Sequence, residues 1–449
     1  MNKEELHNSI QLSDHFTYGR LLRFVSPSIC MMIFLSIYSI VDGFFVSNFV
    51  GKTPLAAINL MYPILIILGT FGFMLGTGGA ALVGKVLGEG DREKANQYFS
   101  FFAYVIIAWG VVCVILGQIG LRPLCILLGA EGQVLADCIV YGRVIGLVLP
   151  CFMLQYFFQT FFVTAEKAHL GLLCTVVSGV LNMVLDALFI VGFDWGLAGA
   201  ASATAIAQVF GGVFPLIYFS RENTSLLRFT RTRWDGAALK QACTNGASEM
   251  LSCIANSIVT ILYNYQLLAL AGDDGVAAFS VILYLGFIFT GFFEGYAVGS
   301  SPIISYNYGA QNHAELKNMV KKSFILEVGA GVVLTAAALV LAKPLAQIFV
   351  GYDANLMDMT VDGLRVYALA YVMMGVGTFG SAFFTALNNG KISAMISFVR
   401  IFIFECGSIL ILPRIFGLYG VWSSIVVAEA ASFVMVVIFV VKYRGKYGY

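Results

Sequence analysis

One sequence pattern occurs twice in this chain, with a constant separation of 221 residues. Gly78 recurs as Gly299, and Pro123-Leu124 recurs as Pro344-Leu345. The same offset relates Gly88 to Gly309, Phe162, Thr164 and Ala165 to Phe383, Thr385 and Ala386, and Gly196-Leu197, Gly199 and Ser202 to Gly417-Leu418, Gly420 and Ser423. Chance matches would scatter over many offsets, so the chain consists of two copies of one module, each about half of its length.

The composition predicts that both copies lie in a membrane. Of the 449 residues, 59% are hydrophobic and only 11% are charged, whereas soluble proteins contain about 25% charged residues. The mean hydropathy of +0.87 agrees, because a soluble domain cannot hide this much apolar surface and a lipid bilayer can. The 47 glycines are typical of closely packed membrane helices. The net charge of +1 gives no reason to expect nucleic-acid binding.

Apolar runs between charged breaks predict an all-α polytopic membrane protein with twelve transmembrane helices, since roughly 20 apolar residues are enough to cross a bilayer. A transmembrane β-barrel is not expected, because its strands would alternate apolar and polar residues and these runs do not. The predicted helices cover residues 19–47, 54–86, 96–119, 134–163, 168–192 and 195–219 in the first copy, and 237–271, 276–307, 319–341, 357–387, 391–412 and 417–442 in the second.

Lysine and arginine are distributed unevenly around these helices. With the N-terminus in the cytoplasm, nineteen of the 26 basic residues fall in cytoplasmic segments, which is the bias that sets orientation in membranes. We therefore expect a multi-pass protein of the cytoplasmic membrane with both termini inside. Each copy holds an even number of helices, so the two bundles should be related by a pseudo-two-fold axis along the membrane normal. The predicted segments are 1–18 (cytoplasmic N-terminal segment), 19–219 (first six-helix bundle), 220–236 (cytoplasmic linker), 237–442 (second bundle) and 443–449 (cytoplasmic tail).

Four polar residues in the first copy are the main candidate site. Asp42 lies on the first predicted helix, and Asp186 lies on the fifth, four residues after Asn182, so that Asn182 and Asp186 share one helix face. Thr204 follows on the sixth helix. Ionisable groups at membrane depth are costly and usually functional, and desolvation and a neighbouring carboxylate both favour the neutral form of a carboxyl group. These residues are predicted to bind and release H⁺, or to hold Na⁺; no other metal and no cofactor is expected.

The second copy lacks this set of residues. At the offset of 221, Asp42 corresponds to Tyr263 and Asp186 corresponds to Gly407. The two bundles have therefore diverged, and we expect the first to bind the coupling ion while both line a central cavity. Other acids do occur within the predicted helices of the second copy, namely Glu249, Glu294, Glu327, Glu405 and Glu429.

Pro27, Tyr38, Glu249 and Glu294 complete the candidate residues. Proline removes a backbone hydrogen bond from a helix and can kink it, so Pro27 would let the protonation state of Asp42 reshape the first helix; a static kink is the alternative. Tyr38, Glu249 and Glu294 are candidates for the lining of the cavity, where aromatic faces and carboxylates attract cations.

Four stretches resemble motifs of the multidrug and toxic compound extrusion (MATE) transporters. They are Val41-Asp42-Gly43-Phe44-Phe45-Val46 on the first helix, 182–190 on the fifth, 196–204 on the sixth and Pro302-Ile303-Ile304-Ser305-Tyr306-Asn307-Tyr308-Gly309-Ala310 at the end of the eighth. The last stretch is most similar to the bacterial MepA-like branch. The resemblance covers nearly the whole chain and preserves its division into six plus six helices.

The resemblance implies a secondary antiporter that exports organic, amphipathic cations in exchange for H⁺ or Na⁺. By motif position, Asp42, Asn182, Asp186 and Thr204 match the family's cation-coupling residues, and Pro27 matches its bendable first helix. The chain departs from the sodium-coupled members that use acids in the second bundle, because its tenth helix contains none between residues 366 and 387. Expected partners are small cationic molecules and membrane lipid, and a monomer is expected.

Three other functions fit the sequence less well. A flippase or exporter of a lipid-linked or other metabolite would share the architecture, but phosphate-bearing cargo favours a basic cavity, and the charges at membrane depth here are mainly acidic. An intramembrane enzyme is not expected, since the sequence shows no HExxH motif and no GxSxG motif with a partner. An ion channel is not expected either, because two tandem copies provide no ring of filter residues.

Overall fold

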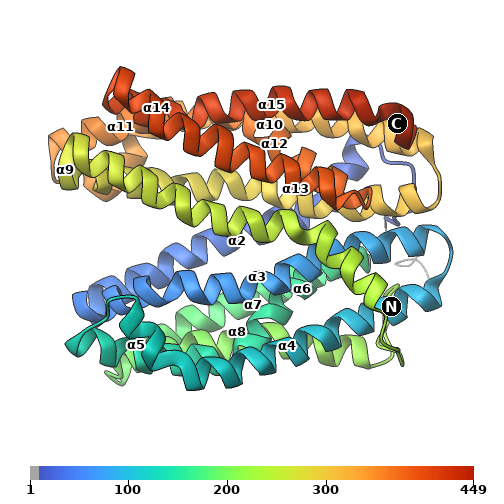
Figure 1. The fold of residues 1–449 in the computed structure, drawn as a ribbon, viewed down its shortest axis with the longest axis horizontal. Coiled ribbons are helices and arrows are strands. Elements are labelled where there is room, and N and C mark those ends of the chain that lie inside the picture. Colours follow the sequence, from blue (N-terminus) through green and yellow to red (C-terminus); the bar gives the residue numbers. More distant parts are fainter. Residues whose placement is uncertain (1–9) are drawn as a thin grey trace. The chain divides into compact units, whose positions relative to one another are not determined.

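The computed structural model describes residues 10–449, and this part of the chain is helical almost throughout (Figure 1). Nine of its helices are long and apolar enough to cross a membrane, and two bent pairs of shorter helices bring the number to 11. The 74-residue helix α9 contains a break at Gly272, where φ is 62°, and therefore provides two crossings. The prediction of twelve membrane-spanning helices is thereby confirmed. Residues 1–9 of the predicted N-terminal segment lie outside the described part of the chain.

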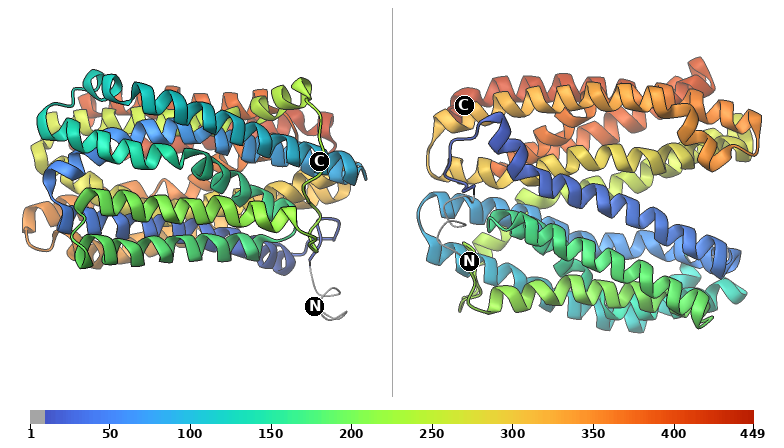
Figure 2. Two further views of the ribbon diagram at one scale, coloured as in Figure 1. Left: turned by 90° about the horizontal axis from the view of Figure 1, so that it is seen from below. Right: turned by 180° about the vertical axis from the view of Figure 1, so that it is seen from behind.

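The helices of the first copy follow the predicted apolar runs closely. Two π-helical segments, η1 and η2, directly extend α2 and α7. Helices α7 and α8 lie side by side (Figure 2). The elements are α2 (Tyr18–Phe45), η1 (Val46–Val50), α3 (Lys52–Gly88), α4 (Arg92–Leu127), α5 (Gly132–Leu147), α6 (Leu149–Thr164), α7 (Ala168–Asp186), η2 (Ala187–Gly192) and α8 (Gly196–Ser220).

The second copy repeats this order. Helices α5 and α6 meet at an angle of 53°, and α11 and α12 meet at 51°, at positions that the offset of 221 relates. A third π-helical segment, η3, interrupts the eleventh crossing. The elements are α9 (Gly236–Gly309), α10 (His313–Val350), α11 (Ala354–Ala368), α12 (Tyr371–Ala386), α13 (Gly390–Phe398), η3 (Val399–Glu405), α14 (Cys406–Phe416) and α15 (Leu418–Tyr447).

The chain folds into two compact units, and each includes a segment from the other half of the sequence. Phe34–Gly246 belong to the first unit, whereas Leu12–Ile33 and Ala247–Tyr449 belong to the second. Helix α2 thus starts in the second unit and ends in the first, and α9 does the reverse. The predicted bundles, 19–219 and 237–442, assigned each of these segments to its own half of the sequence.

Glycines allow both exchanged segments to pack at backbone distance. In the second unit, a Cβ atom at Gly295 would lie 2.4 Å from the Cα atom of Ile29 on α2. In the first unit, a Cβ atom at Gly78 of α3 would lie 2.0 Å from the carbonyl oxygen of Ala242 on α9. Small residues of this kind are what close helix packing in membranes requires.

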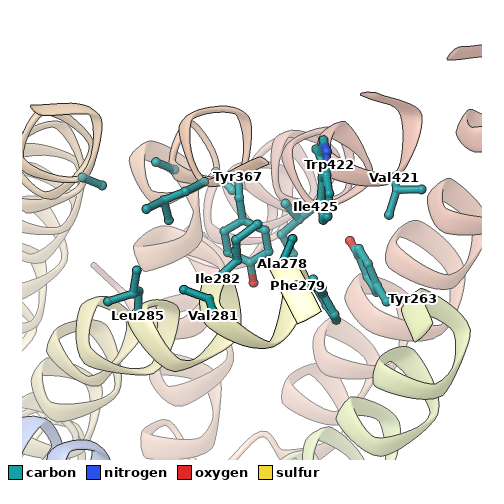
Figure 3. Close-up of a cluster of buried hydrophobic side chains, with 14 of the residues drawn as sticks. Tyr263, Ala278, Phe279, Val281, Ile282, Leu285, Tyr367, Val421, Trp422 and Ile425 are labelled. Carbon is teal, nitrogen blue, oxygen red and sulfur yellow. The ribbon is translucent and has the colours of Figure 1, made fainter. Parts of the chain in front are cut away.

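A hydrophobic core of the second unit lies around Tyr263, Phe279 and Trp422 (Figure 3). The rings of Tyr263 and Phe279 are stacked, with centroids 4.6 Å apart and planes inclined by 7°. Tyr263, the counterpart of Asp42 in the repeat, is 1% exposed. The second unit therefore has packed aromatic rings where the first unit has its acid.

Candidate functional site

The structure brings the four predicted polar residues of the first unit together. Tyr38 and Asp42 are one turn apart on α2, and Asn182 and Asp186 are one turn apart on α7. Asn182 is 1% exposed and Asp186 is fully buried. The carboxyl groups of Asp42 and Asp186 lie within electrostatic range of each other. Two short rows of polar groups, one on each helix, thus face each other.

Helix α7 can approach both neighbours closely because of small residues on its surface. A Cβ atom at Gly179 would lie 2.6 Å from the ring of Phe34 on α2. On the side of α8, the hydroxyl group of Ser178 donates to the carbonyl oxygen of Ala207 at 2.8 Å. One turn further along, Nδ2 of Asn182 donates to Oγ1 of Thr204 at 3.3 Å. These contacts fix the face of α7 that carries Asp186.

A π-helical segment follows each of the two aspartates. Segment η1 begins four residues after Asp42, and η2 begins directly after Asp186. Val46 of η1, Ile190 of η2 and Ala200 of α8 form a small buried cluster, each at most 3% exposed. Short π-helical turns inside α-helices are frequent at functional sites. The cluster holds the ends of α2 and α7 together next to the acids.

The site contains buried oxygen atoms that no donor of the protein satisfies. Within residues 10–449, no hydrogen-bond partner meets Oδ1 of Asp42, Oδ1 of Asn182 or either carboxyl oxygen of Asp186. Buried polar atoms are hydrogen-bonded in the large majority of cases, and unpaired buried charge is strongly unfavourable. Four acceptor oxygens from three side chains are therefore suited to a shared proton or to a small hard cation, which prefers oxygen ligands.

Two tyrosines near the acids were not predicted from the sequence. Tyr141 of α5 lies within electrostatic range of Asp42 and is 8% exposed. Tyr62 of α3 lies within electrostatic range of Tyr38 and Tyr141. Tyrosines in apolar runs look like packing residues, and only the position of Tyr141 near the carboxyl group of Asp42, and of Tyr62 near Tyr38 and Tyr141, distinguishes these two. Their phenol groups extend the polar site toward α3 and α5.

Pro27 lies in the part of α2 that belongs to the second unit, whereas Asp42 lies in the part that belongs to the first. Pro27 is buried, and α2 continues through it as one helix from Tyr18 to Phe45. At a rise of 1.5 Å per residue, about 22 Å of helix separates the two residues. Its role as a kink stays a prediction.

Four of the five acids predicted for the second unit lie within electrostatic range of one arginine, Arg400. Glu249 is partly buried and Glu294 is exposed, on the two arms of α9. Both lie within electrostatic range of Arg400. Glu327 of α10 is fully buried, and within the described chain neither of its carboxyl oxygens has a hydrogen-bond partner. None of these acids replaces the Asp42–Asp186 arrangement, because each comes from a different position of the repeat.

An open groove of about 610 Å³ lies in the second unit, between the two arms of α9 and next to its break. None of the predicted residues lines it. Its walls are mainly apolar and carry one acid, one amide, one phenol group and one serine hydroxyl group. The lining residues are Ile261, Asn264, Tyr265, Leu268, Asp273, Val276, Ala277 and Ser280.

The comparison with known protein families decides the class of protein. The model of the MatE family matches residues 27–188 and 250–406, which together make up more than half of the chain. The chain belongs to the MatE family. It is therefore a multi-pass membrane transporter and not an enzyme, and the resemblance to MATE transporters is confirmed. The two matched segments start 223 residues apart, close to the offset of the repeat.

Relatives in this family cover nearly the whole chain. The multidrug export protein MepA of Staphylococcus saprophyticus is 24% identical over 436 residues, covering 94% of each chain. A MATE crystal structure in complex with MaL6 superposes with a TM-score of 0.93 at 21% identity, over 98% of this chain and 99% of the other. An outward-facing multidrug resistance MATE transporter also gives 0.93, at 22% identity and 98% coverage of each chain. The solved structures share the twelve-helix fold.

Proposed function

We propose that the chain is a secondary antiporter that exports organic, amphipathic cations in exchange for H⁺ or Na⁺. In this proposal it works as a monomer in the cytoplasmic membrane, with both termini in the cytoplasm. The two units rock between an inward-open and an outward-open state. The coupling ion binds at Asp42, Asn182, Asp186 and Thr204 in the first unit.

The observation that carries this proposal is the set of unsatisfied acceptor oxygens on Asp42, Asn182 and Asp186. Two adjacent carboxylates repel each other when both are ionised, and one bound proton or Na⁺ removes that repulsion. Uptake of the ion from the outer side would favour release of the cargo, and loss of the ion to the cytoplasm would reset the site. Coupling requires only that each ligand binds the two states with different affinity.

The available driving force is sufficient for steep export. One charge moving down a membrane potential of 100 mV yields about 2.3 kcal/mol. One proton moving down a gradient of one pH unit yields about 1.4 kcal/mol more. Exchange of one proton for a singly charged cation moves no net charge, so only the pH term remains and supports a cargo gradient of about tenfold per pH unit, since every 1.4 kcal/mol corresponds to about a factor of ten. With two protons for each cargo cation, the potential term and twice the pH term both contribute and support a gradient of roughly several thousandfold.

The cationic nature of the cargo is supported by the charges at membrane depth. Acids outnumber basic residues there, with Glu249 and Glu294 both accessible in the second unit. The groove of α9 adds Tyr265 and Asp273 among apolar walls, a surface suited to an aromatic cation. A relative with 24% identity is named a multidrug export protein. Lipid-linked phosphate cargo would require basic groups instead.

Transport in proteoliposomes tests the proposal. Purified protein is reconstituted, a pH or sodium gradient is imposed separately, and the movement of cationic dyes is followed by fluorescence. We expect Asp42→Asn to insert into the membrane but to lose gradient-driven dye transport. Asp194→Asn is the matched control, because Asp194 is exposed and its φ of 54° suits asparagine. Unchanged transport by Asp42→Asn would contradict the proposed coupling site.

A further inference from the structure

Arg400 of η3 forms a buried ion pair that the proposed transport cycle does not use. Its Nη2 and Nε atoms donate to Oε1 of Glu429 at 2.7 and 3.0 Å. Its Nη1 atom donates to the hydroxyl oxygen of Thr378 at 3.3 Å. The side chain of Glu429 is 2% exposed and that of Arg400 is 19% exposed. The guanidinium group is therefore held by two other elements, α15 and α12.

The backbone of α12 makes room for this pair. A Cβ atom at Gly377 would lie 3.2 Å from Oε2 of Glu429 and 3.3 Å from Nε of Arg400. Both contacts are tighter than ordinary van der Waals distances, so any side chain at position 377 would press on the pair. Glycine at this position lets α12, η3 and α15 meet around one guanidinium group.

The π-helical turn directs a second acid toward the same place. Arg400 and Glu405 are five residues apart within η3. In an α-helix, two such residues would point about 140° apart, but the i to i+5 hydrogen bond of a π-helix brings them near one face. Arg400 lies within electrostatic range of Glu405 and also of Glu294 on α9. One guanidinium group thus lies within electrostatic range of several carboxyl groups.

The first unit has no counterpart of the pair. At the offset of 221, Arg400 corresponds to Gly179 and Glu429 corresponds to Gln208. The first unit therefore has a neutral residue at both positions of the pair. The second unit has the charged pair and has Tyr263 in place of Asp42.

We propose that Arg400 is a tethered cation. In the second unit it occupies the place beside Glu429 that a mobile cation, or the guanidinium-type head group of a cargo molecule, would otherwise take. The arginine compensates the negative charge of Glu429 permanently, because it is part of the chain and all three of its guanidinium nitrogens donate hydrogen bonds to Glu429 or Thr378. Removing the arginine side chain while leaving Glu429 should therefore create a binding site for a free guanidinium-type cation. If the proposed function is right, a further consequence is that Glu429 contributes no exchangeable ion to the transport cycle.

Rescue by free guanidinium tests the tethered cation independently of transport. Full-length Arg400→Ala protein is purified in detergent, and its melting temperature is measured with guanidinium chloride or ethylguanidinium chloride at millimolar concentrations, well below the denaturing range. We expect Arg400→Ala to melt at a lower temperature than the unmodified protein, because Glu429 loses its partner. Guanidinium should restore part of the lost melting temperature, as any ligand that binds only the folded state does.

Three controls separate a filled site from a general effect. Urea has the same shape as guanidinium but no charge, and it should restore nothing. The unmodified protein should gain nothing from guanidinium, because its site is full. Arg400→Ala combined with Glu429→Gln should fold, since a neutral pair replaces a charged one, and it should not respond to guanidinium.

The proposal is overturned by any of three results. The first is an Arg400→Ala protein that melts at the same temperature as the unmodified protein. The second is equal stabilisation by urea and guanidinium. The third is a guanidinium response that persists when Glu429 is also changed to Gln. If Arg400→Ala gives no folded protein, Arg400→Gln retains a donor for Thr378 and undergoes the same comparison. Failure of these tests would leave the role of Asp42 in transport untouched.

Discussion

A methyl group added at Gly246 would occupy space that the backbone of α3 already fills. A Cβ atom there would lie 1.9 Å from the carbonyl oxygen of Met74, whereas ordinary contacts begin at 3.4 Å. The start of α9 would have to move away from α3 by about 1.5 Å, because a backbone carbonyl cannot rotate aside as a side chain can. Gly78, which faces the same crossing from α3, would lose its contact with Ala242.

We therefore expect Gly246→Ala to destabilise the protein by about 1–3 kcal/mol, the usual cost of overpacking. Gly117→Ala is the matched control: Gly117 also lies within a helix, but its added Cβ atom meets nothing within 4 Å. Alanine is favoured over glycine in a helix by about 1 kcal/mol, so this variant should become more stable. Thermal unfolding in detergent measures both variants against the unmodified protein.

The two substitutions are expected to change the melting temperature in opposite directions, which makes the comparison decisive. The contact geometry predicts that Gly246→Ala melts below the unmodified protein and that Gly117→Ala melts at or above it. If both substitutions lower the melting temperature equally, or if Gly246→Ala has no effect, the backbone contact between α3 and α9 does not limit what fits at this crossing.

Three further predictions concern the acid site and the core. Asp186→Asn should alter the pH profile of dye transport in proteoliposomes, because one of two interacting carboxyl groups is lost; an unchanged profile would assign Asp186 a structural role. Thr204→Ser should retain transport and Thr204→Val should reduce it, since only serine keeps the hydroxyl oxygen that accepts from Asn182; equal activities would exclude that bond from the mechanism. Trp422→Ala should cost about 3–5 kcal/mol of stability, because Trp422 is 1% exposed, and a melting temperature near that of Trp422→Phe would contradict this.

The membrane-spanning helices could be predicted from the sequence because each is defined locally by a run of apolar residues between charges. The repeat then added information at long range, since it predicted that both halves share one fold. The bends at Val148 and near Leu369 were not predicted: each divides one predicted helix into a pair, and no charged residue marks the division. The π-helical segments η1, η2 and η3 have no compositional signal either.

The acid site was accessible to sequence reasoning because Asn182 and Asp186 are one turn apart and acids are rare at this depth. Asp42 lies 144 residues before Asp186 and was grouped with these residues because it is the other acid at membrane depth in the first copy; the resemblance then supported this grouping. The pairing of Arg400 with Glu429 could not be predicted, because it depends on how η3, α12 and α15 pack. Charge alone made the glutamates of the second copy look equivalent, whereas the structure distinguishes buried Glu429 and Glu327 from exposed Glu294.

The exchange of Leu12–Ile33 and of the start of α9 between the two units has a consequence for biosynthesis. The ribosome makes the first part of α2 long before the helices against which it packs exist, so this segment waits in the bilayer until α9 has been inserted. A product truncated after α8 would likewise lack the helix that covers Gly78. We therefore expect that neither half of the sequence folds alone and that the halves form a stable protein only when they are produced together.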